Sequence, residues 1–412
     1  MKRSADPSAC PSAGPSDTSS WNPSDVRALA GAPARAGISR RAFVAGGTGV
    51  LALLGLTPLV GRAAFADAAS AQADVDAPER TTAADLPVIG GHTTYPYTYT
   101  TYDYNRNKVE VTVEKAPERV VAAYQNNVET LLALGLGDRI VCAFGLDDPN
   151  DLGNLQDAFD QIPYLDSRPG QEEVIGLEPD FIAAWYSLFA DDRLGDVPAW
   201  HKRGCGTYMS LNSSCRGKTG TYYQTIYDEM RDIQQLGVIF DRQDEAQKIV
   251  NEMLAEVEKI ADHVATLVER PSVAVLENED DSYRVYSEMT LGGNVAMEAG
   301  AQLAVGKGSD TANISAEDLI AASPDAVFMV WYDGFKTPDE AVADIADNAR
   351  FASLSAVREG KVFPCSLTGI YCSGLHTLDG IRAFSEALYP ELYEGEAGTS
   401  AAGDVASSKR DA

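Results

Sequence analysis

Two segments of this chain carry the same short pattern. Residues 172–185 read EEVIGLEPDFIAAW, and residues 317–331 read EDLIAASPDAVFMVW. In each, a Glu is followed seven residues later by Pro-Asp, and an apolar run that ends in Trp comes next. Pro ends a helix, Asp begins a turn, and a short apolar run is typical of a buried strand. Each copy therefore predicts a helix-to-strand corner, and the repetition predicts two lobes of similar fold.

The rest of the chain fits two such lobes, because 412 residues suffice for two domains of ordinary size. Apolar runs typical of strands alternate with helical patterns, which predicts parallel sheets covered by helices. In the first lobe, residues 93–221, these runs occupy 118–124, 139–145, 180–185 and 206–210. In the second lobe, residues 271–392, they occupy 272–278, 325–331 and 360–366.

Two further segments have a clear periodicity. Residues 222–270 are helical in pattern, with a break near 237–241, and predict one long rigid helix that joins the lobes. Tyrosines at 95, 97 and 99 alternate with polar residues, and VEVTV follows at 109–113. This alternation, with the turn-like NRNK between, predicts a β-hairpin at the start of the first lobe.

The two ends of the chain differ from the lobes. Residues 1–66 hold seven Lys or Arg against three Asp, and Arg40-Arg41 precedes a weakly apolar run and the cleavage pattern Ala64-Phe65-Ala66. This region resembles a twin-arginine export signal, and the glycines in its apolar run disfavour the alternative of a membrane anchor. Residues 67–92 are expected to be a flexible leader and residues 393–412 a disordered tail. The mature protein is thus expected outside the cytoplasmic membrane, with no lipid-anchor cysteine.

Charge and cysteines limit the classes of partner and site. A net charge of -28 argues against nucleic acid, which requires a basic surface. In an oxidising compartment, two cysteine pairs are close enough in sequence to close small disulfide loops, Cys205 with Cys215 and Cys365 with Cys372. A structural metal site is the weaker alternative, since neither pair has zinc-type spacing and the chain has only 4 His. No cofactor is predicted.

Four segments resemble the substrate-binding proteins of ABC importers that take up iron-siderophores, haem and cobalamin. These segments are PERVVAAYQNNVETLLALGLGDRIV, GLEPDFIAAW, ISAEDLIAASPDAVFMVW and FASLSAVREGKVFPCS. The resemblance covers roughly residues 105–392 and implies two α/β lobes joined by a rigid helix, with the ligand cleft between them. It also implies that one Glu on each lobe docks onto Arg residues of a membrane permease. The matching positions are Glu172 and Glu317, and the alternative for each is a solvated carboxylate at a helix start.

The ligand site is expected where the strands end. In open parallel sheets, ligands bind beyond the carboxyl ends of the strands. The candidates are Tyr124, Gln125, Asn126, Trp185, Tyr186, Arg284, Tyr286, Trp331, Tyr332, Tyr371 and His376. Aromatic rings suit a large ringed or chelated ligand, Arg284 and Lys307 favour an anionic one, and Trp185 and Trp331 end the two matched segments. His376 or one of the tyrosines is a candidate ligand for haem iron.

These patterns predict an extracytoplasmic binding protein rather than an enzyme. We expect it to capture an iron-siderophore or similar metal chelate and to deliver it, as a monomer, to an ABC importer permease at the membrane. A haem- or cobalamin-binding protein of the same fold is the alternative. An exported α/β hydrolase is less favoured, because the chain has neither a G-x-S-x-G nor an H-E-x-x-H motif.

Overall fold

The computed structural model describes residues 80–147, 149, 152–214, 222–279, 282–307, 312–332 and 334–394. The predicted export signal, residues 67–79 of the predicted leader, Cys215 and the chain beyond residue 394 lie outside these ranges.

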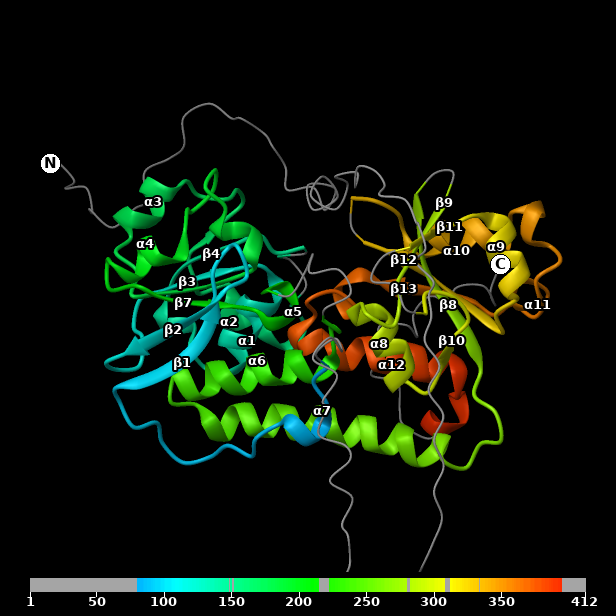
Figure 1. The fold of residues 1–412 in the computed structure, drawn as a ribbon, viewed down its shortest axis with the longest axis horizontal. Helices are drawn as coiled ribbons and strands as arrows, with labels where there is room; N and C mark the ends of the chain where they lie inside the picture. The colour runs from blue at the N-terminus through cyan, green and yellow to red at the C-terminus, as the bar shows by residue number, and fades with distance from the viewer. Residues whose placement is uncertain are drawn as a thin grey trace, which may run out of the picture. The chain divides into compact units, whose positions relative to one another are not determined.

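The first lobe is built on a five-stranded sheet in which all neighbouring strands are parallel, as predicted (Figure 1). The strand order is β5 (Tyr164–Leu165), β4 (Ile140–Phe144), β3 (Val120–Ala123), β6 (Phe181–Ala184) and β7 (Gly206–Met209). The helices of this lobe are α1 (Gln125–Ala133), α2 (Gln156–Phe159), α3 (Gln171–Gly176), α4 (Val197–His201) and α5 (Leu211–Ser214). The predicted hairpin is confirmed as β1 (Tyr97–Tyr102) and β2 (Lys108–Val113), which pair antiparallel.

The second lobe has a mixed sheet, whereas the sequence predicts a parallel one. Its order is β11 (Ala312–Ile314), β9 (Ser282–Val285), β8 (Ser272–Glu279), β12 (Ala326–Trp331) and β13 (Val362–Ser366), and β10 (Gln302–Leu303) also pairs with β8. β8, β12 and β13 are parallel, but β9 returns antiparallel to β8. The helices are α8 (Leu291–Glu298), α9 (Ala316–Ala322), α10 (Pro338–Ala346), α11 (Ser355–Arg358) and α12 (Thr377–Leu388).

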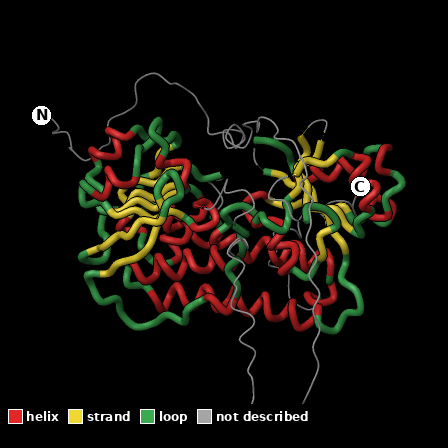
Figure 2. The backbone as a smooth tube through the Cα atoms, viewed as in Figure 1, coloured by secondary structure: helices red, strands yellow, loops and turns green. Residues whose placement is uncertain are grey.

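The long helix predicted between the lobes is present, and a shorter helix precedes it. α6 (Ile226–Ile239) ends near the predicted break, and α7 (Gln243–Val264) provides the long continuous helix. The two pack closely at Gly237, where a Cβ would lie 2.4 Å from the Cβ of Ala246. α7 runs alongside α6 and on to α8 and α12 of the second lobe, as the ribbon and the tube both show (Figures 1 and 2). Among the described residues, no helix is both long and apolar enough to cross a membrane.

The repeated Pro-Asp corner joins neighbouring strands. The Asp180 carboxylate accepts hydrogen bonds from the backbone N–H groups of Glu118 (2.9 Å) and Arg119 (2.8 Å), just before β3. Asp325 accepts from the backbone N–H and the hydroxyl of Ser272, both at 2.8 Å, at the start of β8. These bonds from Ser272 lower the pKa of Asp325. In both lobes the Asp therefore ties the corner to the adjacent parallel strand.

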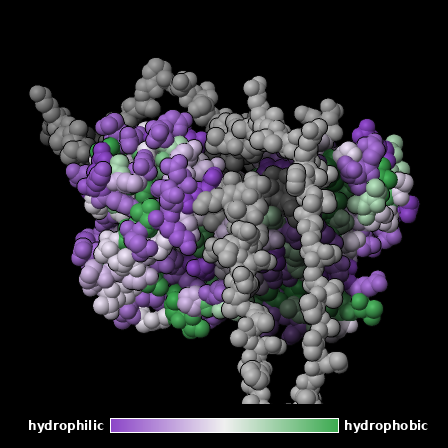
Figure 3. Space-filling model, in the orientation of Figure 1, coloured by the Kyte–Doolittle hydropathy of each residue, from purple (hydrophilic) through white to green (hydrophobic). Residues whose placement is uncertain are grey.

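Part of the predicted leader is packed rather than flexible. The Thr81 hydroxyl donates to the buried Asp228 of α6 at 2.6 Å, and the Ile89 N–H donates to Gln247 of α7 at 2.9 Å. Ordered partners of this kind offset the entropy of fixing the chain. Elsewhere, hydrophilic residues predominate on the face shown in Figure 3, and the exposed large apolar side chains include Val88 and Val268.

Candidate ligand site and docking surface

An aromatic cluster lies at the carboxyl edge of the first sheet. Tyr124, which follows β3, stacks on Trp185, which follows β6, with ring centroids 4.2 Å apart and planes at 14°. The indole Nε1–H of Trp185 donates to Asn126 Oδ1 at 2.8 Å. All three side chains are buried, since even Trp185 is only 7% exposed. The three side chains therefore form a buried, hydrogen-bonded cluster with little accessible surface.

A segment of the second lobe packs against this aromatic cluster. After β13 the chain reaches Tyr371, whose ring meets Trp185 edge-on at 5.9 Å. Three residues later the Gly374 N–H donates to Glu229 Oε2 of α6 at 2.7 Å. Gly374 has φ +53, and a Cβ there would lie 2.8 Å from the Cβ of Asn126. We call residues 370–376 the crossing segment, because it leaves the second lobe and packs on α1 and α6 of the first.

The crossing segment ends in an ionic cluster at His376. Nε2 of His376 lies 3.0 Å from a carboxylate oxygen of Glu129 in α1, and Nδ1 lies 2.8 Å from Asp379. Burial opposes the charged ring, but the hydrogen bonds to Asp379 and Glu129 outweigh it and raise the pKa of His376 to about 10. Gln125 also donates to Glu129. Because carboxylates engage both ring nitrogens, His376 would have to leave one of them before it could ligate haem iron.

The cationic candidate of the second lobe is paired with an acid. The sequence places Arg284 after a strand, but it lies within β9, directly opposite Glu277 of β8. Arg284 Nη1 lies 3.7 Å from Glu277 Oε2, and the Tyr286 hydroxyl donates to the same oxygen at 3.1 Å. The buried Glu277 therefore offsets much of the attraction that Arg284 would exert on an anionic ligand.

A third group follows β12. Tyr332 stacks on Phe335 with centroids 4.9 Å apart and planes at 18°, and Tyr332 forms a β-bridge with Lys336. Lys336 is in turn ion-paired with Asp344 of α10. Trp331 is half-buried against a hydrophobic cluster different from that of Trp185. That Trp185 and Trp331 face each other across a ligand stays a prediction.

The predicted candidates thus fall into three groups. The first group is a connected set with residues from both lobes: Tyr124, Gln125, Asn126, Trp185, Tyr186, Tyr371 and His376. Arg284 and Tyr286 form a second, and Trp331 and Tyr332 a third. Among the described residues, no three His, Cys, Asp or Glu side chains come together as a metal site.

Comparison with known proteins identifies this architecture. Residues 120–366, more than half of the chain, match the family of periplasmic binding proteins. The chain belongs to this family.

Its relatives include proteins of ABC transporters. An uncharacterized ABC transporter substrate-binding lipoprotein of Bacillus subtilis (strain 168) is 22% identical over 288 residues, which are 69% of this chain and 84% of that protein. A periplasmic binding protein from Veillonella parvula DSM 2008 has a TM-score of 0.67 at 29% identity and covers 74% of this chain and 94% of its own. The ABC-type Fe3+-hydroxamate transport system protein from Saccharomonospora viridis DSM 43017 has a TM-score of 0.57 at 22% identity, with 72% and 100% covered. The fold of this periplasmic binding protein is that of ABC transporter substrate-binding proteins.

The two glutamates predicted to dock on a permease occupy corresponding positions in this periplasmic binding protein. Glu172 is exposed in the first turn of α3, and Glu317 is exposed in the first turn of α9. Asp318 is used locally, because it accepts hydrogen bonds from the N–H and hydroxyl of Ser315, and these bonds lower its pKa. Asp318 therefore closes the helix cap, whereas Glu317 projects from the same turn. The docking role itself stays a prediction.

The cysteine pairing differs from the prediction. Cys365 and Cys372 are not joined by a disulfide in the structure. Cys365 faces the main core from β13, whereas Cys372 lies on the crossing segment and packs in the aromatic cluster of the first lobe. The two sulfurs therefore lie in different hydrophobic cores. Cys205 is buried as a thiol, and burial raises its pKa to about 12, but its predicted partner Cys215 lies outside the described residues.

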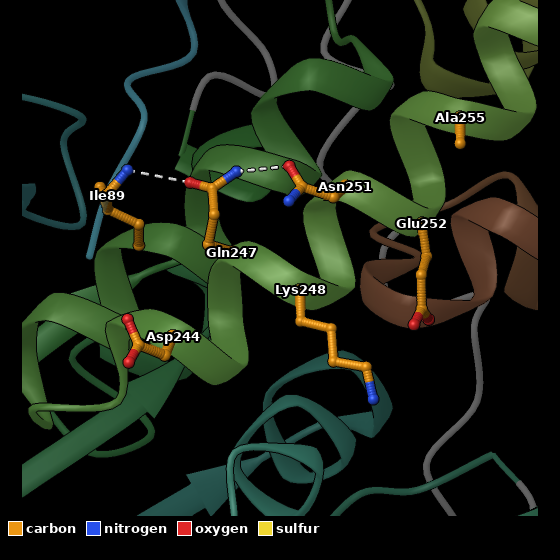
Figure 4. Close-up of a pocket in the computed structure, with 7 residues that line it drawn as sticks. All are labelled: Ile89, Asp244, Gln247, Lys248, Asn251, Glu252 and Ala255. Carbon is orange, nitrogen blue, oxygen red and sulfur yellow. Dashed lines mark hydrogen bonds between the residues drawn. The ribbon is translucent and has the colours of Figure 1, made fainter. Parts of the chain in front are cut away.

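A shallow groove also lies on the outer side of α7 (Figure 4). It has a volume of about 420 Å³ and includes none of the predicted ligand residues. Figure 4 shows Gln247 at its centre, between the Ile89 backbone and Asn251, to which it is hydrogen-bonded. Asp244, Lys248 and Glu252 also line the groove and are exposed. The groove is open, unlike the enclosed sites that small molecules usually occupy.

Proposed function

We propose that this periplasmic binding protein captures an iron-siderophore or a similar metal chelate outside the cytoplasmic membrane and delivers it to the permease of an ABC importer. The observation that carries the proposal is the aromatic cluster of Tyr124 and Trp185, which Tyr371 joins from the other lobe. An aromatic cluster with hydroxyl groups beside it suits a large ringed or chelated ligand. The similarity to the Fe3+-hydroxamate protein of Saccharomonospora viridis is consistent with this ligand class.

A ferric chelate is favoured over haem for this chain. The imidazole most available by sequence, His376, has both nitrogens engaged by carboxylates. Members of this family normally bind substrates and do not transform them, so the match over residues 120–366 gives no support to the hydrolase alternative.

Export of the protein across the cytoplasmic membrane is part of the proposal. We infer that a twin-arginine-type signal in residues 1–66 directs export and that the mature chain works as a monomer without a lipid anchor. Mass spectrometry of the protein from its own host would show a new amino terminus near Ala66. An amino-terminal lipid or retention of residues 1–66 would contradict the inference.

Ligand capture is tested by tryptophan fluorescence. Titration with a ferric tris-catecholate, a ferric tris-hydroxamate, haem and cobalamin should quench the emission with at least one ferric chelate, because Trp185 lies in the proposed site. A Trp185→Phe variant should lose most of the quenching and keep its fold. If no chelate binds and an ester substrate is turned over, the binding function is wrong.

Permease docking is tested separately from ligand capture. The double variant Glu172→Ala with Glu317→Ala should abolish chelate uptake by cells while it leaves the affinity of the purified protein unchanged. Glu173→Ala is the matched control, because this neighbouring carboxylate is also exposed in the same first turn. Loss of ligand affinity in the double variant would place these glutamates in the ligand site instead.

A further inference from the structure

A buried carboxylate of α6 connects the two lobes. Glu229 is 0% exposed, and its Oε2 atom accepts a hydrogen bond from the Gly374 N–H of the crossing segment at 2.7 Å. Its Oε1 atom accepts one from the Asn212 side chain at 2.6 Å. Asn212 lies in α5, which follows β7 at the carboxyl edge of the first sheet. One side chain therefore ties the crossing segment of the second lobe to the edge of the first sheet where the ligand site is proposed.

Both partners of Glu229 act as donors. Gly374 offers its backbone N–H, which cannot accept a hydrogen bond. The Asn212 amide is fixed in the same sense, because its Nδ2 also donates to the Thr225 carbonyl at 2.9 Å and its Oδ1 accepts the Thr225 N–H at 3.2 Å. Two N–H donors that face two oxygens match an ionised carboxylate, whereas protonation makes one of these oxygens a donor and a weaker acceptor. The structure therefore shows the arrangement of an ionised Glu229.

The contact of Glu229 reaches the aromatic cluster through the crossing segment. Gly374 packs on Asn126, which accepts the indole N–H of Trp185 at 2.8 Å. Tyr371 of the same segment meets Trp185 edge-on, with ring centroids 5.9 Å apart. Glu229 is not among the partners of either ring, so its effect on the ligand site would be exerted through the position of the crossing segment.

Charged groups from several elements lie near Glu229. On α6 itself, Asp228 and Asp232 are the neighbouring acids, and each accepts a hydrogen bond from a hydroxyl group of another segment. The crossing segment contributes His376, which is ion-paired with Glu129 of α1 at 3.0 Å. Of the acids of α6, Glu229 is the one hydrogen-bonded to the backbone of the crossing segment.

The charge of Glu229 changes near neutral pH. Burial raises the pKa of Glu229 to about 7, although the hydrogen bonds from Asn212 and Gly374 oppose this rise. The pKa of His376 lies at about 10, so His376 keeps its charge from pH 6 to pH 8.5. Over this range the bond from the Gly374 N–H changes from a neutral to a charge-assisted hydrogen bond, and charge-assisted bonds are roughly twice as strong.

We propose that Glu229 is a positioning residue for the ligand site: its ionised carboxylate latches the crossing segment to the first lobe, and protonation releases this segment. We call the two hydrogen bonds of Glu229, to Gly374 and Asn212, the latch. Because the latch keeps Tyr371 against Trp185, a chelate should bind more tightly when the latch is closed. The effect on binding rests on the proposed function, whereas the latch itself is measured in the ligand-free protein.

Hydrogen exchange tests the latch without a ligand. Exchange in the peptide that contains residues 370–376, corrected for the intrinsic effect of pH, should be about fivefold faster at pH 6 than at pH 8.5. Glu229→Gln should exchange rapidly at both pH values, because its amide N–H groups face one of the two donors. The comparison of the native protein at the two pH values needs no variant, so it remains a test even if Glu229→Gln does not fold.

Glu298→Gln is the matched control. Glu298 is a partly buried carboxylate that accepts the Tyr227 hydroxyl at 3.0 Å, and burial raises its pKa as well. It lies in α8 rather than beside the crossing segment. This variant should therefore show the same exchange and the same pH dependence as the native protein.

Chelate affinity tests the consequence for the ligand site. A ferric tris-hydroxamate is the probe, because this chelate is neutral and its charge does not change between pH 6 and pH 8.5. The native protein should bind it about fivefold more weakly at pH 6. Glu229→Gln should bind it equally at both pH values, with the weaker affinity, and Glu298→Gln should follow the native protein.

Different results would contradict different parts of the inference. Exchange in the native protein that does not vary with pH, or a pH dependence that persists unchanged in Glu229→Gln, would overturn the latch. If exchange shows the latch but chelate affinity is the same at both pH values, Glu229 does not position the ligand site. If exchange shows the latch and the native protein binds no chelate, the proposed function fails while the latch stands.

Discussion

Replacement of His376 by Gln should loosen the contact between the lobes. In the native protein His376 is charged and lies between Glu129, which is 2% exposed, and the solvent-facing Asp379. Gln can donate one hydrogen bond in place of the ring but carries no charge. The variant therefore leaves the buried Glu129 carboxylate without its positive partner, a situation that is costly in a protein interior.

The size of the effect follows from the pKa of His376. Its rise from 6.5 to about 10 corresponds to about 5 kcal/mol at about 1.4 kcal/mol per unit. The imidazole is 30% exposed, and Asp379 is 69% exposed, so solvent screens part of this interaction. We therefore expect His376→Gln to lower the free energy of unfolding by about 2 to 3 kcal/mol at pH 6.

The dependence on pH has a definite sign. Because folding raises the pKa, the stabilisation by His376 is fully present below pH 6.5 and is lost as the pH rises through about 10. Urea unfolding of the native and variant proteins at pH 6 and at pH 10.5 should show the difference between them shrink at the higher pH. Asp379→Asn serves as the control and should cost less than about 1 kcal/mol, because Asp379 is exposed.

Two results would refute this reasoning. One is a difference between native and His376→Gln proteins that stays the same from pH 6 to pH 10.5, since the charge of the ring would then be irrelevant. The other is an equal loss of stability in Asp379→Asn, which would mean that Glu129 is not the partner that matters.

Three further predictions concern a glycine of the crossing segment, the two corner aspartates and a buried cysteine. Gly374→Ala should lower the free energy of unfolding, measured in urea, by about 2 kcal/mol or more and should weaken ligand binding, because the new Cβ combines a positive φ with a clash. Gly360→Ala is the control and should cost about 1 kcal/mol, because Gly360 also has a positive φ but open space around its Cβ. Asp180→Asn and Asp325→Asn should each cost about 1 kcal/mol at neutral pH. Since hydrogen bonds lower the pKa of Asp325, its contribution should persist above pH 3.8 and disappear as the pH falls through the lowered value, and a constant cost down to pH 2 would contradict this. Burial raises the pKa of the Cys365 thiol well above its usual range. Iodoacetamide should therefore leave Cys365 unmodified in the native protein and label it in urea. Rapid labelling of the native protein would contradict this prediction and show that β13 opens.

The amino-acid sequence determined the plan of the two lobes. The Pro-Asp corners, the buried strands and the long helix α7 follow from patterns a few residues long, because Pro, turn-forming Asp and apolar periodicity act locally. The same patterns located Tyr124 and Trp185 at the ends of neighbouring strands, which the parallel sheet then brought together.

Only the tertiary structure decided which side chains meet. His376 and Glu129 are 247 residues apart, and no local pattern pairs them. Arg284 acquired its acidic partner because β9 turns back on β8, and Tyr371 reached Trp185 because the crossing segment leaves the second lobe. Such contacts depend on strand order and on how segments cross between lobes, and these are fixed by packing and hydrogen bonding over the whole fold. The sequence therefore set where the proposed ligand site lies, while the charged groups around it and their pairing arose on folding.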